Sequence, residues 1–510
     1  MNLKTFVQGF GAAVTVLILR VWPHLSSYHP VIYHSFLPIH SVIWGVLLDL
    51  GVVTLLAALL FRYLEKNETG LRTVLWAFVA AELASASVTA LGVMRRAPIP
   101  YLGPDKVYLV ILLAALALRW LRPVDYRRAV RVLGALIVLA GCSMVWMIPE
   151  LFYQGLRAQR ADVPVPAMHP ALVSDRSAPA EGGRIVWLLF DELSYDQTFE
   201  HRFSGLALPA FDKFRSESVV FSDLKPAGYY TDRVIPSFFL GTQVDSIRST
   251  LDGEPQVKLA GSRRWQAFDA RATLFSDAQR LGWTTGVVGW YNPYCRILAG
   301  MLNYCFWRMG DGQSDGAMPD QSVWQNAMAP LLESGRRWNH EPGSAQQRHV
   351  QDHAAIMPQA EALIRDQSIN FVFIHLPVPH PPGAYDRNHQ GGTGSYIDNL
   401  ALADKSLGEL LTTLAGTAMA AKATVIVCSD HSWRVPMWRS TPVWTKEDEA
   451  ASHGRFDPRP VLMIHFPGQQ TEQDVTRPFD EIRIHEMIET LLRGQQPHFE
   501  SLLAGAHPHP

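Results

Sequence analysis

The stretch RIVWLLFDE, residues 184–192, decides the fold of the second half of the chain. Six apolar residues follow Arg184 and end directly at the acidic pair Asp191 and Glu192. A continuous apolar run of this length is typical of a strand buried on both faces, as in a parallel sheet. Further runs of the same kind follow along the chain, at residues 284–290, 369–376, 423–429 and 460–466.

Helical patterns separate these predicted strands. Amphipathic stretches lie at residues 207–216, 269–281, 396–414 and 478–493. Apolar strands that alternate with helices indicate an α/β domain with a mostly parallel central sheet, covered by helices on both faces. We therefore predict one large domain over residues 185–510. In such sheets, ligands bind beyond the carboxyl ends of the strands.

The first part of the chain is apolar in a different way. Long apolar stretches lie at residues 5–22, 41–61, 71–94, 106–120 and 130–153. Several reach the roughly 20 residues that a helix needs to cross a bilayer. The sequence therefore predicts a transmembrane domain of about five helices over residues 1–153. The stretch 106–120 is short, so it either spans the membrane or forms a re-entrant or buried helix.

The placement of Lys and Arg predicts the orientation of these helices, because these residues collect in cytoplasmic loops. Loop 23–40 has none, whereas cations gather at Lys4 and in loops 62–72 and 119–131. Loop 95–106, which has three cations, argues against this reading. We expect a multi-pass protein of the bacterial inner membrane whose C-terminal domain faces the periplasm or the cell exterior. Residues 154–184, rich in Ala and Pro, are predicted to be a linker.

Composition excludes two other classes of protein. The chain carries a net charge of −2 and only 18% charged residues, whereas a nucleic-acid binder would show a strongly basic face. Its 48% hydrophobic residues also argue against global disorder.

Carboxylates and imidazoles gather where the predicted strands end. Asp191 and Glu192 follow the first strand, and Asp430 and His431 follow the strand at 423–429. Two histidines, His375 and His380, lie in IHLPVPHPP, and His453 precedes the last strand. Carboxylate oxygens and imidazole nitrogens are common ligands of zinc and related divalent metals. Although one such residue is more often a helix cap, several at one edge of a sheet predict a metal site.

Thr231 lies in PAGYYTDRVIPSFFLGT, residues 226–242, five positions before Pro236. The apolar residues around this proline could begin a helix, with Pro236 near its first turn. A hydroxyl at a helix N-terminus lies near amide donors and the positive end of the dipole, which favours an alkoxide nucleophile. The alternative is a helix N-cap or a surface hydroxyl.

Cys295 and Cys305 are separated by a short loop in YNPYCRILAGMLNYC. Since the predicted domain lies outside the cytoplasm, where disulfides persist, these cysteines are predicted to form a disulfide. The alternative is two unpaired buried thiols.

Together these segments resemble the alkaline phosphatase/sulfatase superfamily. The resemblance rests on the acidic pair after a strand, the Thr and Pro about forty residues later, IHLPVPHPP, SDH after a strand and SHG before the last strand. It is greatest to the membrane-anchored phosphoethanolamine and phosphoglycerol transferases, including lipid A modifying enzymes and lipoteichoic acid synthases. Those families also place about five transmembrane helices before an extracytoplasmic catalytic domain.

The resemblance implies a role for each site residue. Thr231 would be the nucleophile and a metal ligand, and His380 would bind the transferred phosphate or protonate the leaving oxygen. The implied metal ligands are Glu192, Asp430 and His431, with Asp191 as a second acidic ligand and His453 as a ligand or a phosphate contact.

The chain departs from the family pattern at several positions. Asp191 stands where these transferases commonly have Gly, and Asp232 and Arg233 stand where smaller residues are frequent. Arg233 would contact a phosphate or face solvent. A sulfatase would need Cys or Ser two residues before the proline and Arg two residues after it, and this chain has Val234 and Phe238 there.

Three functions follow from this reading. The first is a metal-dependent transferase that moves phosphoethanolamine or phosphoglycerol from a membrane phospholipid to a glycan or lipid of the envelope, through a phospho-threonine. Its divalent metal would be zinc, with Mn²⁺, Mg²⁺ or Ca²⁺ as alternatives. The second is a phosphatase, phosphodiesterase or sulfatase. The third is an inactive binding protein within an envelope polysaccharide assembly system.

Overall fold

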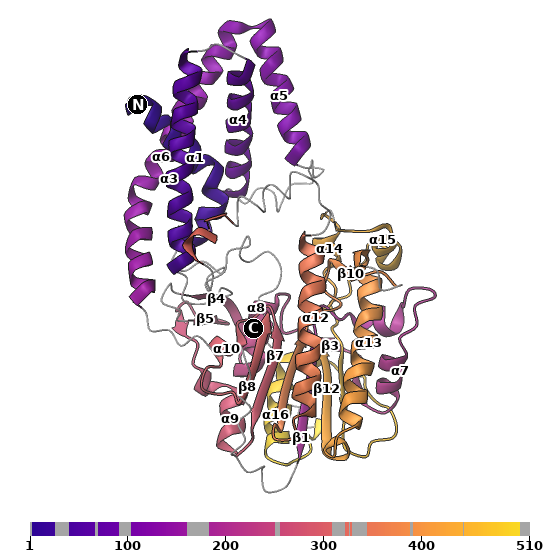
Figure 1. Ribbon diagram of the computed structural model, residues 1–510. Helices are drawn as coiled ribbons and strands as arrows, with labels where there is room; N and C mark the ends of the chain where they lie inside the picture. Colours follow the sequence, from indigo (N-terminus) through magenta and orange to yellow (C-terminus); the bar gives the residue numbers. More distant parts are fainter. Residues whose placement is uncertain are drawn as a thin grey trace. The chain divides into compact units, whose positions relative to one another are not determined.

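The computed structural model describes residues 3–25, 40–66, 70–90, 104–160, 183–249, 255–308, 322–325, 327–328, 344–387, 391–441 and 443–499. Two compact units make up the chain, of which the first holds residues 1–163 and the second holds most of residues 164–510 (Figure 1). The first unit is helical, and the second combines helices with a large sheet.

The described part of the first unit forms five apolar helices, close to the predicted positions. They are α1 (Leu3–Leu25), α3 (His40–Lys66), α4 (Gly70–Ala90), α5 (Pro104–Leu121) and α6 (Pro123–Arg160). Two stretches, His40–Tyr63 and Pro123–Leu156, are long and apolar enough to cross a membrane, whereas α1 and α5 hold shorter apolar stretches. By length and composition alone, two such helices are weak evidence of membrane association, so the five predicted spans go beyond this finding.

Small residues let the helices of this unit approach closely. A Cβ atom added to Gly11 on α1 would lie 2.1 Å from the backbone oxygen of Ile137 on α6. One added to Gly9 would lie 2.6 Å from the backbone nitrogen of Ala58 on α3. Any larger side chain at these positions would force the helices apart, as at the small-residue interfaces of membrane helices.

The predicted linker begins later than the sequence indicated. Helix α6 continues to Arg160, so residues 154–160 are helical, and strand β1 begins at Arg184. The packing of α6 continues beyond Tyr153, because Gln154 and Gly155 are still buried. Residues 161–182, the rest of the predicted linker, lie outside the described residues.

The central sheet of the second unit has eight strands among the described residues. Its neighbours follow the order β14-β2-β13-β12-β1-β9-β7-β8. The strands are β1 (Arg184–Phe190), β2 (Val219–Phe221), β7 (Thr285–Trp290), β8 (Tyr304–Arg308), β9 (Phe371–Leu376), β12 (Ala423–Ser429), β13 (Leu462–His465) and β14 (Gln473–Val475). The central pairs are parallel, as predicted, and only the pairs that β13 makes are antiparallel.

The register brings the ends of the central strands to one edge. Phe190, the last residue of β1, pairs with Ser429 of β12 and with Leu376 of β9. Because β13 is antiparallel, its first residue, Leu462, pairs with Cys428 near the end of β12. Three strand exits and one strand entry therefore meet at the same edge, which is where the sequence predicts the site.

Helices cover both faces of the sheet. On one face, α7 (Pro209–Ser216), α12 (Ser344–Arg365) and α13 (Tyr396–Ala415) share a core with the alternate residues Val186 and Leu188 of β1. Figure 1 shows α12 and α13 on the same face of the sheet. On the other face, Trp187 contacts Phe238 and Phe239 of α8 (Thr231–Leu240). Helices α9 (Leu274–Arg280) and α16 (Ile484–Leu492) complete this layer. The two-residue period of the strand explains the two layers.

Two predicted helices are shorter than the sequence indicated. The stretch 478–493 begins with strand β15 (Phe479–Asp480), which pairs with β3 (Leu224–Lys225), and α16 starts only at Ile484. The stretch 269–281 begins with a 3₁₀ turn, Ala270–Ala272, before α9. The side-chain pattern at the start of both stretches is helical, but the backbone there forms a strand pair in one case and a 3₁₀ turn in the other.

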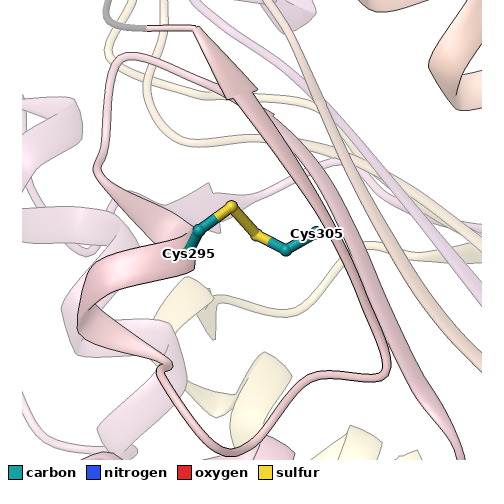
Figure 2. Close-up of a disulfide and its surroundings, with 2 residues drawn as sticks. All are labelled: Cys295 and Cys305. Carbon is teal, nitrogen blue, oxygen red and sulfur yellow. A yellow bond between two sulfur atoms is a disulfide. The ribbon is translucent and has the colours of Figure 1, made fainter. Parts of the chain in front are cut away.

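The structure joins Cys295 and Cys305 in a disulfide (Figure 2). Cys295 lies on the short helix α10 (Tyr294–Ile297), and Cys305 lies on the edge strand β8. The bond closes a loop with a sequence separation of ten residues. It thereby fixes the segment that follows β7 against the edge of the sheet.

Candidate active site

Side chains from four segments meet at the carboxyl edge of the sheet. Asp191 follows β1, His375 is the second-last residue of β9, Asp430 and His431 follow β12, and Thr231 begins α8. All five are buried, and the four on the sheet have no exposed surface. The structure therefore brings these five residues together, whereas His453, which the sequence analysis placed with them, is not part of this group.

The hydroxyl of Thr231 lies within this cluster. Its Oγ1 donates a hydrogen bond to Asp191 Oδ2 at 3.3 Å and lies 3.3 Å from His431 Nε2. His431 Nε2 is also 3.2 Å from Asp430 Oδ2. The ligand atoms of Asp191, Asp430 and His431 all lie within 4.8 Å of one another. One hydroxyl, two carboxylates and one imidazole thus face a common centre.

The chemistry of this cluster fits a divalent cation. Asp191 Oδ1 and Asp430 Oδ2 are buried and accept no hydrogen bond. A buried carboxylate oxygen without a partner is costly, and two such carboxylates close together repel each other. A cation bound between them would satisfy both oxygens at once, and oxygen and nitrogen ligands of this kind are those of zinc and related metals.

The two carboxylates differ in their electrostatic surroundings. Burial and the neighbouring Asp430 raise the pKa of Asp191 well above its usual value. Burial opposes ionisation of Asp430 as well, but the nearby His431 and His375 lower its pKa below the usual value. Asp430 therefore carries the charge of the pair, and Asp191 is the stronger base.

Helix α8 holds Thr231 in place. Tyr230, the residue before the helix, is extended, and Gly241 ends the helix in a left-handed conformation with φ 64°. The Asn292 side chain donates a hydrogen bond to the Thr231 backbone oxygen at 3.3 Å. Thr231 stands in the first turn, where the helix dipole stabilises negative charge on a hydroxyl oxygen. Pro236 lies inside the helix, one turn later than predicted.

Glu192 points to a different set of partners. Its backbone has φ 64°, a left-handed conformation that is uncommon for a residue with a side chain. Its carboxylate pairs with the Arg434 guanidinium and accepts from Trp438 Nε1 at 3.0 Å and 2.9 Å. Glu192 can also reach a second group of ligand atoms with Asp191 and His380. Asp191, rather than Glu192, faces Thr231 and Asp430.

His380 lies beside this ion pair as a neutral ring. Its Nε2 lies 3.2 Å from Arg434 Nη2 and 4.0 Å from Glu192 Oε1. Burial and the Arg434 cation lower its pKa well below the usual value. Because Arg434 can only donate, Nε2 accepts and the proton sits on Nδ1, which is buried. His380 can thus donate from Nδ1 to an anion.

Residues 184–493 match the model of the sulfatase family. The chain belongs to the sulfatase family. Enzymes of this family are metal-dependent, and they belong to the wider alkaline phosphatase/sulfatase superfamily. None of the curated proteins matches this sulfatase-family chain.

Solved structures similar to this sulfatase-family enzyme share little sequence with it. The phosphonate monoester hydrolase of Agrobacterium radiobacter is 14% identical, with 64% of this chain and 78% of that chain covered and a TM-score of 0.41. The PsFucS1 sulfatase from Pseudoalteromonas sp. is 14% identical, with 62% of this chain and 68% of that chain covered and a TM-score of 0.42. The lipoteichoic acid synthase LtaP from Listeria monocytogenes is 12% identical, with 64% of this chain and 75% of that chain covered and a TM-score of 0.41.

Two predicted site residues lie outside the cluster of this enzyme. His453 is exposed and follows α15 (Lys446–Ser452) with φ 48°, and it is not among the ligand atoms that lie close together. The Arg233 side chain is 42% exposed, and its guanidinium lies 4.6 Å from the centre of the Tyr230 ring. Their predicted roles as a metal ligand and as phosphate contacts stay predictions.

Sequence reasoning missed two residues of the sulfatase-family site, Arg434 and Trp438. Both lie on the segment that leaves β12, Arg434 just before the short helix α14 (Val435–Trp438) and Trp438 at its end. Their position could have indicated a role in the site, because they lie three and seven residues after His431 on the segment that follows the same strand. His375 was noticed but given no role, and its Nε2 lies 3.2 Å from Asp191 Oδ2.

Replacing Arg434 with methionine is expected to lower the free energy of unfolding by about 3–5 kcal/mol, because the fully buried Glu192 loses its cation. The loss should shrink at lower pH, where Glu192 takes up a proton. Arg202→Met breaks a more exposed ion pair with Asp212 and should cost less than about 1 kcal/mol. Urea unfolding of both variants measures this difference, and equal losses would contradict the assigned pairing.

Two buried histidines on α12 predict a loss of stability in acid. Burial lowers the pKa of His349 to about 3 and that of His353 to about 4. The unfolded chain takes up these protons near pH 6.5 but the folded chain does not, so their stabilising effect is complete above pH 6.5 and is lost between pH 6.5 and about 3–4. Each contributes a slope of about 1.4 kcal/mol per pH unit in that range.

Urea unfolding between pH 7 and pH 5 measures this slope. His349→Phe should reduce the slope by about one proton. A slope that His349→Phe leaves unchanged would mean that this histidine is protonated in the folded chain.

Proposed function

We propose that this sulfatase-family enzyme transfers a phospho-head group, phosphoethanolamine or phosphoglycerol, from a membrane phospholipid to a glycan or lipid acceptor of the cell envelope. The observation that carries the proposal is the position of Thr231 Oγ1, 3.3 Å from both Asp191 Oδ2 and His431 Nε2 at the start of α8. Val234 and Phe238 support it, because they are fully buried apolar residues where a sulfatase would carry its modified residue and its arginine.

The residues of the chain can perform a double displacement. Asp191 Oδ2 accepts the Thr231 hydroxyl and takes its proton as Oγ1 attacks phosphorus, provided that Asp191 is ionised, as it would be beside a divalent cation. The bond from phosphorus to the diacylglycerol oxygen breaks, and that oxygen takes a proton from water. The acceptor hydroxyl then attacks the phospho-threonine and gives its proton to the hydroxide that the first step left. The bond from phosphorus to Thr231 Oγ1 breaks, and Oγ1 regains the proton that Asp191 held.

His380 fits the binding of the transferred phosphate better than protonation of the leaving oxygen. A neutral imidazole can donate a hydrogen bond from Nδ1, whereas it cannot deliver a proton at low cost. Its Nε2 is engaged by Arg434, which itself pairs with Glu192. The ion pair would thus fix both the ring orientation and the tautomer of His380.

Asp191, Asp430 and His431 would hold the metal, with Thr231 as a further ligand and Glu192 at its margin. When bound, a divalent cation such as Zn²⁺ supplies Lewis-acid polarisation of the phosphorus centre and lowers the pKa of the Thr231 hydroxyl. The mixed oxygen and nitrogen set favours zinc, and Mn²⁺, Mg²⁺ and Ca²⁺ remain alternatives.

The proposed donor requires a membrane location. Two apolar helices long enough to span a bilayer support it, and so does the disulfide in the catalytic unit, which suits an oxidising compartment. We propose a multi-pass protein of the bacterial inner membrane whose catalytic unit faces the periplasm or the cell exterior.

Product analysis tests transfer against hydrolysis. The full-length protein in liposomes is given phospholipids labelled in the head group, with and without an extract of envelope glycans and lipids. Transfer places the label on an acceptor and releases diacylglycerol. Hydrolysis, the second candidate because the matching family is that of sulfatases, would release a water-soluble phosphate ester at the same rate with or without the extract.

A further inference from the structure

A cavity of about 310 Å³ lies among helices α1, α3, α4 and α6 of the helical unit. Its described lining residues include the cations Lys4, Arg72 and Arg131, and none of these described residues is a carboxylate. Each cation lies in the first turns of its helix. Lys4 is the second residue of α1, Arg72 the third residue of α4 and Arg131 the ninth residue of α6. Helices far apart in sequence therefore direct three positive charges to one cavity.

The rest of the lining is neutral or apolar. The Gln8 amide adds a neutral hydrogen-bond donor, and the rings of Phe61 and Trp76, with centres 5.2 Å apart, form a buried wall. Gly134 also lines the cavity, and an added Cβ there would stand 3.6 Å from the Trp76 ring and 3.7 Å from Gln8 Nε2. A side chain longer than alanine at Gly134 would therefore fill the cavity.

This combination selects one kind of ligand. Three cations close together in a site partly shielded from water favour an anion, and Arg is suited to phosphate oxygens because its donors match their geometry. The aromatic wall favours an apolar group attached to that anion. The same cations are those that the sequence places on the cytoplasmic side of the membrane, where basic cavities between helices bind lipid head groups.

We propose that this cavity binds a phosphate-bearing anion, either the phosphodiester head group of an anionic phospholipid or a free phosphate ester. The site belongs to the helical unit and takes no part in the proposed head-group transfer. Its lipid form rests on the proposed membrane location, whereas its affinity for phosphate does not.

Lipid binding to the full-length protein in detergent tests the proposal. Native mass spectrometry is used to titrate phosphatidylglycerol, with zwitterionic phosphatidylcholine as the comparison. Arg72→Gln and Arg131→Gln should each weaken binding of phosphatidylglycerol about fivefold to tenfold. Gly134→Leu should weaken it as much or more, although it changes no charge. The matched control is Arg128→Gln, whose exposed side chain pairs with Asp125 on the same helix outside the cavity, and it should change binding less than twofold.

A second arm identifies the source of the phosphate. Inorganic phosphate and glycerol 3-phosphate are tested for a shift in the thermal unfolding of the same variants. A shift in the wild type that Gly134→Leu abolishes, without selective lipid binding, assigns a free phosphate ester. Selective lipid binding without a shift assigns the head group. If Gly134→Leu binds all of these anions like the wild type, or if Arg128→Gln weakens binding as much as Arg72→Gln, the cavity is not the site. Neither readout depends on catalysis.

Discussion

Thr231→Ala is expected to reduce head-group transfer by about 10⁴-fold or more, because it removes the only atom that would bond to phosphorus. The Oγ1 atom lies 3.3 Å from both Asp191 and His431, at the centre of the cluster. Thr231→Ser keeps the hydroxyl and should retain measurable activity. The measurement is the initial rate of label transfer in liposomes.

The matched control for this variant is Thr285→Ala. Thr285, the first residue of β7, is also a buried threonine of the catalytic unit, but its hydroxyl donates to the Met301 backbone oxygen. It should change stability without changing the rate more than a few fold. Mass spectrometry of the wild type should find a phosphoryl-type adduct on Thr231, whose mass identifies the head group. Full activity of Thr231→Ala would refute the proposed intermediate.

Asp430→Asn is expected to remove both the bound metal and the activity, with a fall in rate of about 10³-fold or more. Asp430 is the charged member of the buried pair, and its Oδ2 has no hydrogen-bond donor. In the wild type, Zn²⁺ at a hundred times its dissociation constant should raise the free energy of unfolding by about 2.7 kcal/mol. Asp430→Asn should show no such stabilisation.

Asp352→Asn is the control for a buried carboxylate without a role in the metal site. Asp352 is 4% exposed and accepts from Trp290 and Arg308, so its loss should destabilise the fold. Metal content, measured by elemental analysis, and the stabilisation by Zn²⁺ should remain as in the wild type. If Asp430→Asn kept its metal, the assigned ligand set would be wrong.

Strand-end positions were the most informative signal in the sequence. Asp191 and Asp430 directly follow the neighbouring parallel strands β1 and β12, so the register of the sheet alone brings them together. Thr231 joins them from the start of α8. The direction of the Glu192 side chain could not be predicted. It depends on a backbone φ of 64° and on an ion pair with Arg434, which lies in the segment after β12. Local sequence patterns do not encode such a contact between distant segments.

The same limit applies to the fold. The long apolar runs predicted β1 and β12 at their observed bounds, because each strand is buried along its whole length. The strands β2 and β14 have three residues each, too few to establish a period. At Phe479 the backbone pairs with β3 although the side-chain pattern is helical, so tertiary pairing overrides the local preference.

The antiparallel strand β13 has a consequence for where this enzyme can accept insertions. The chain leaves the sheet at Ser429 and returns at Leu462 on the same edge, so residues 430–461 form one excursion above the site. This excursion carries Asp430, Arg434 and His453, yet it never crosses the sheet. Asp430 and Arg434 lie at the start of this excursion, directly after β12, whereas α15 comes later in it. Insertions between α14 and α15 would therefore lengthen the excursion while leaving both the strand order and these site residues in place.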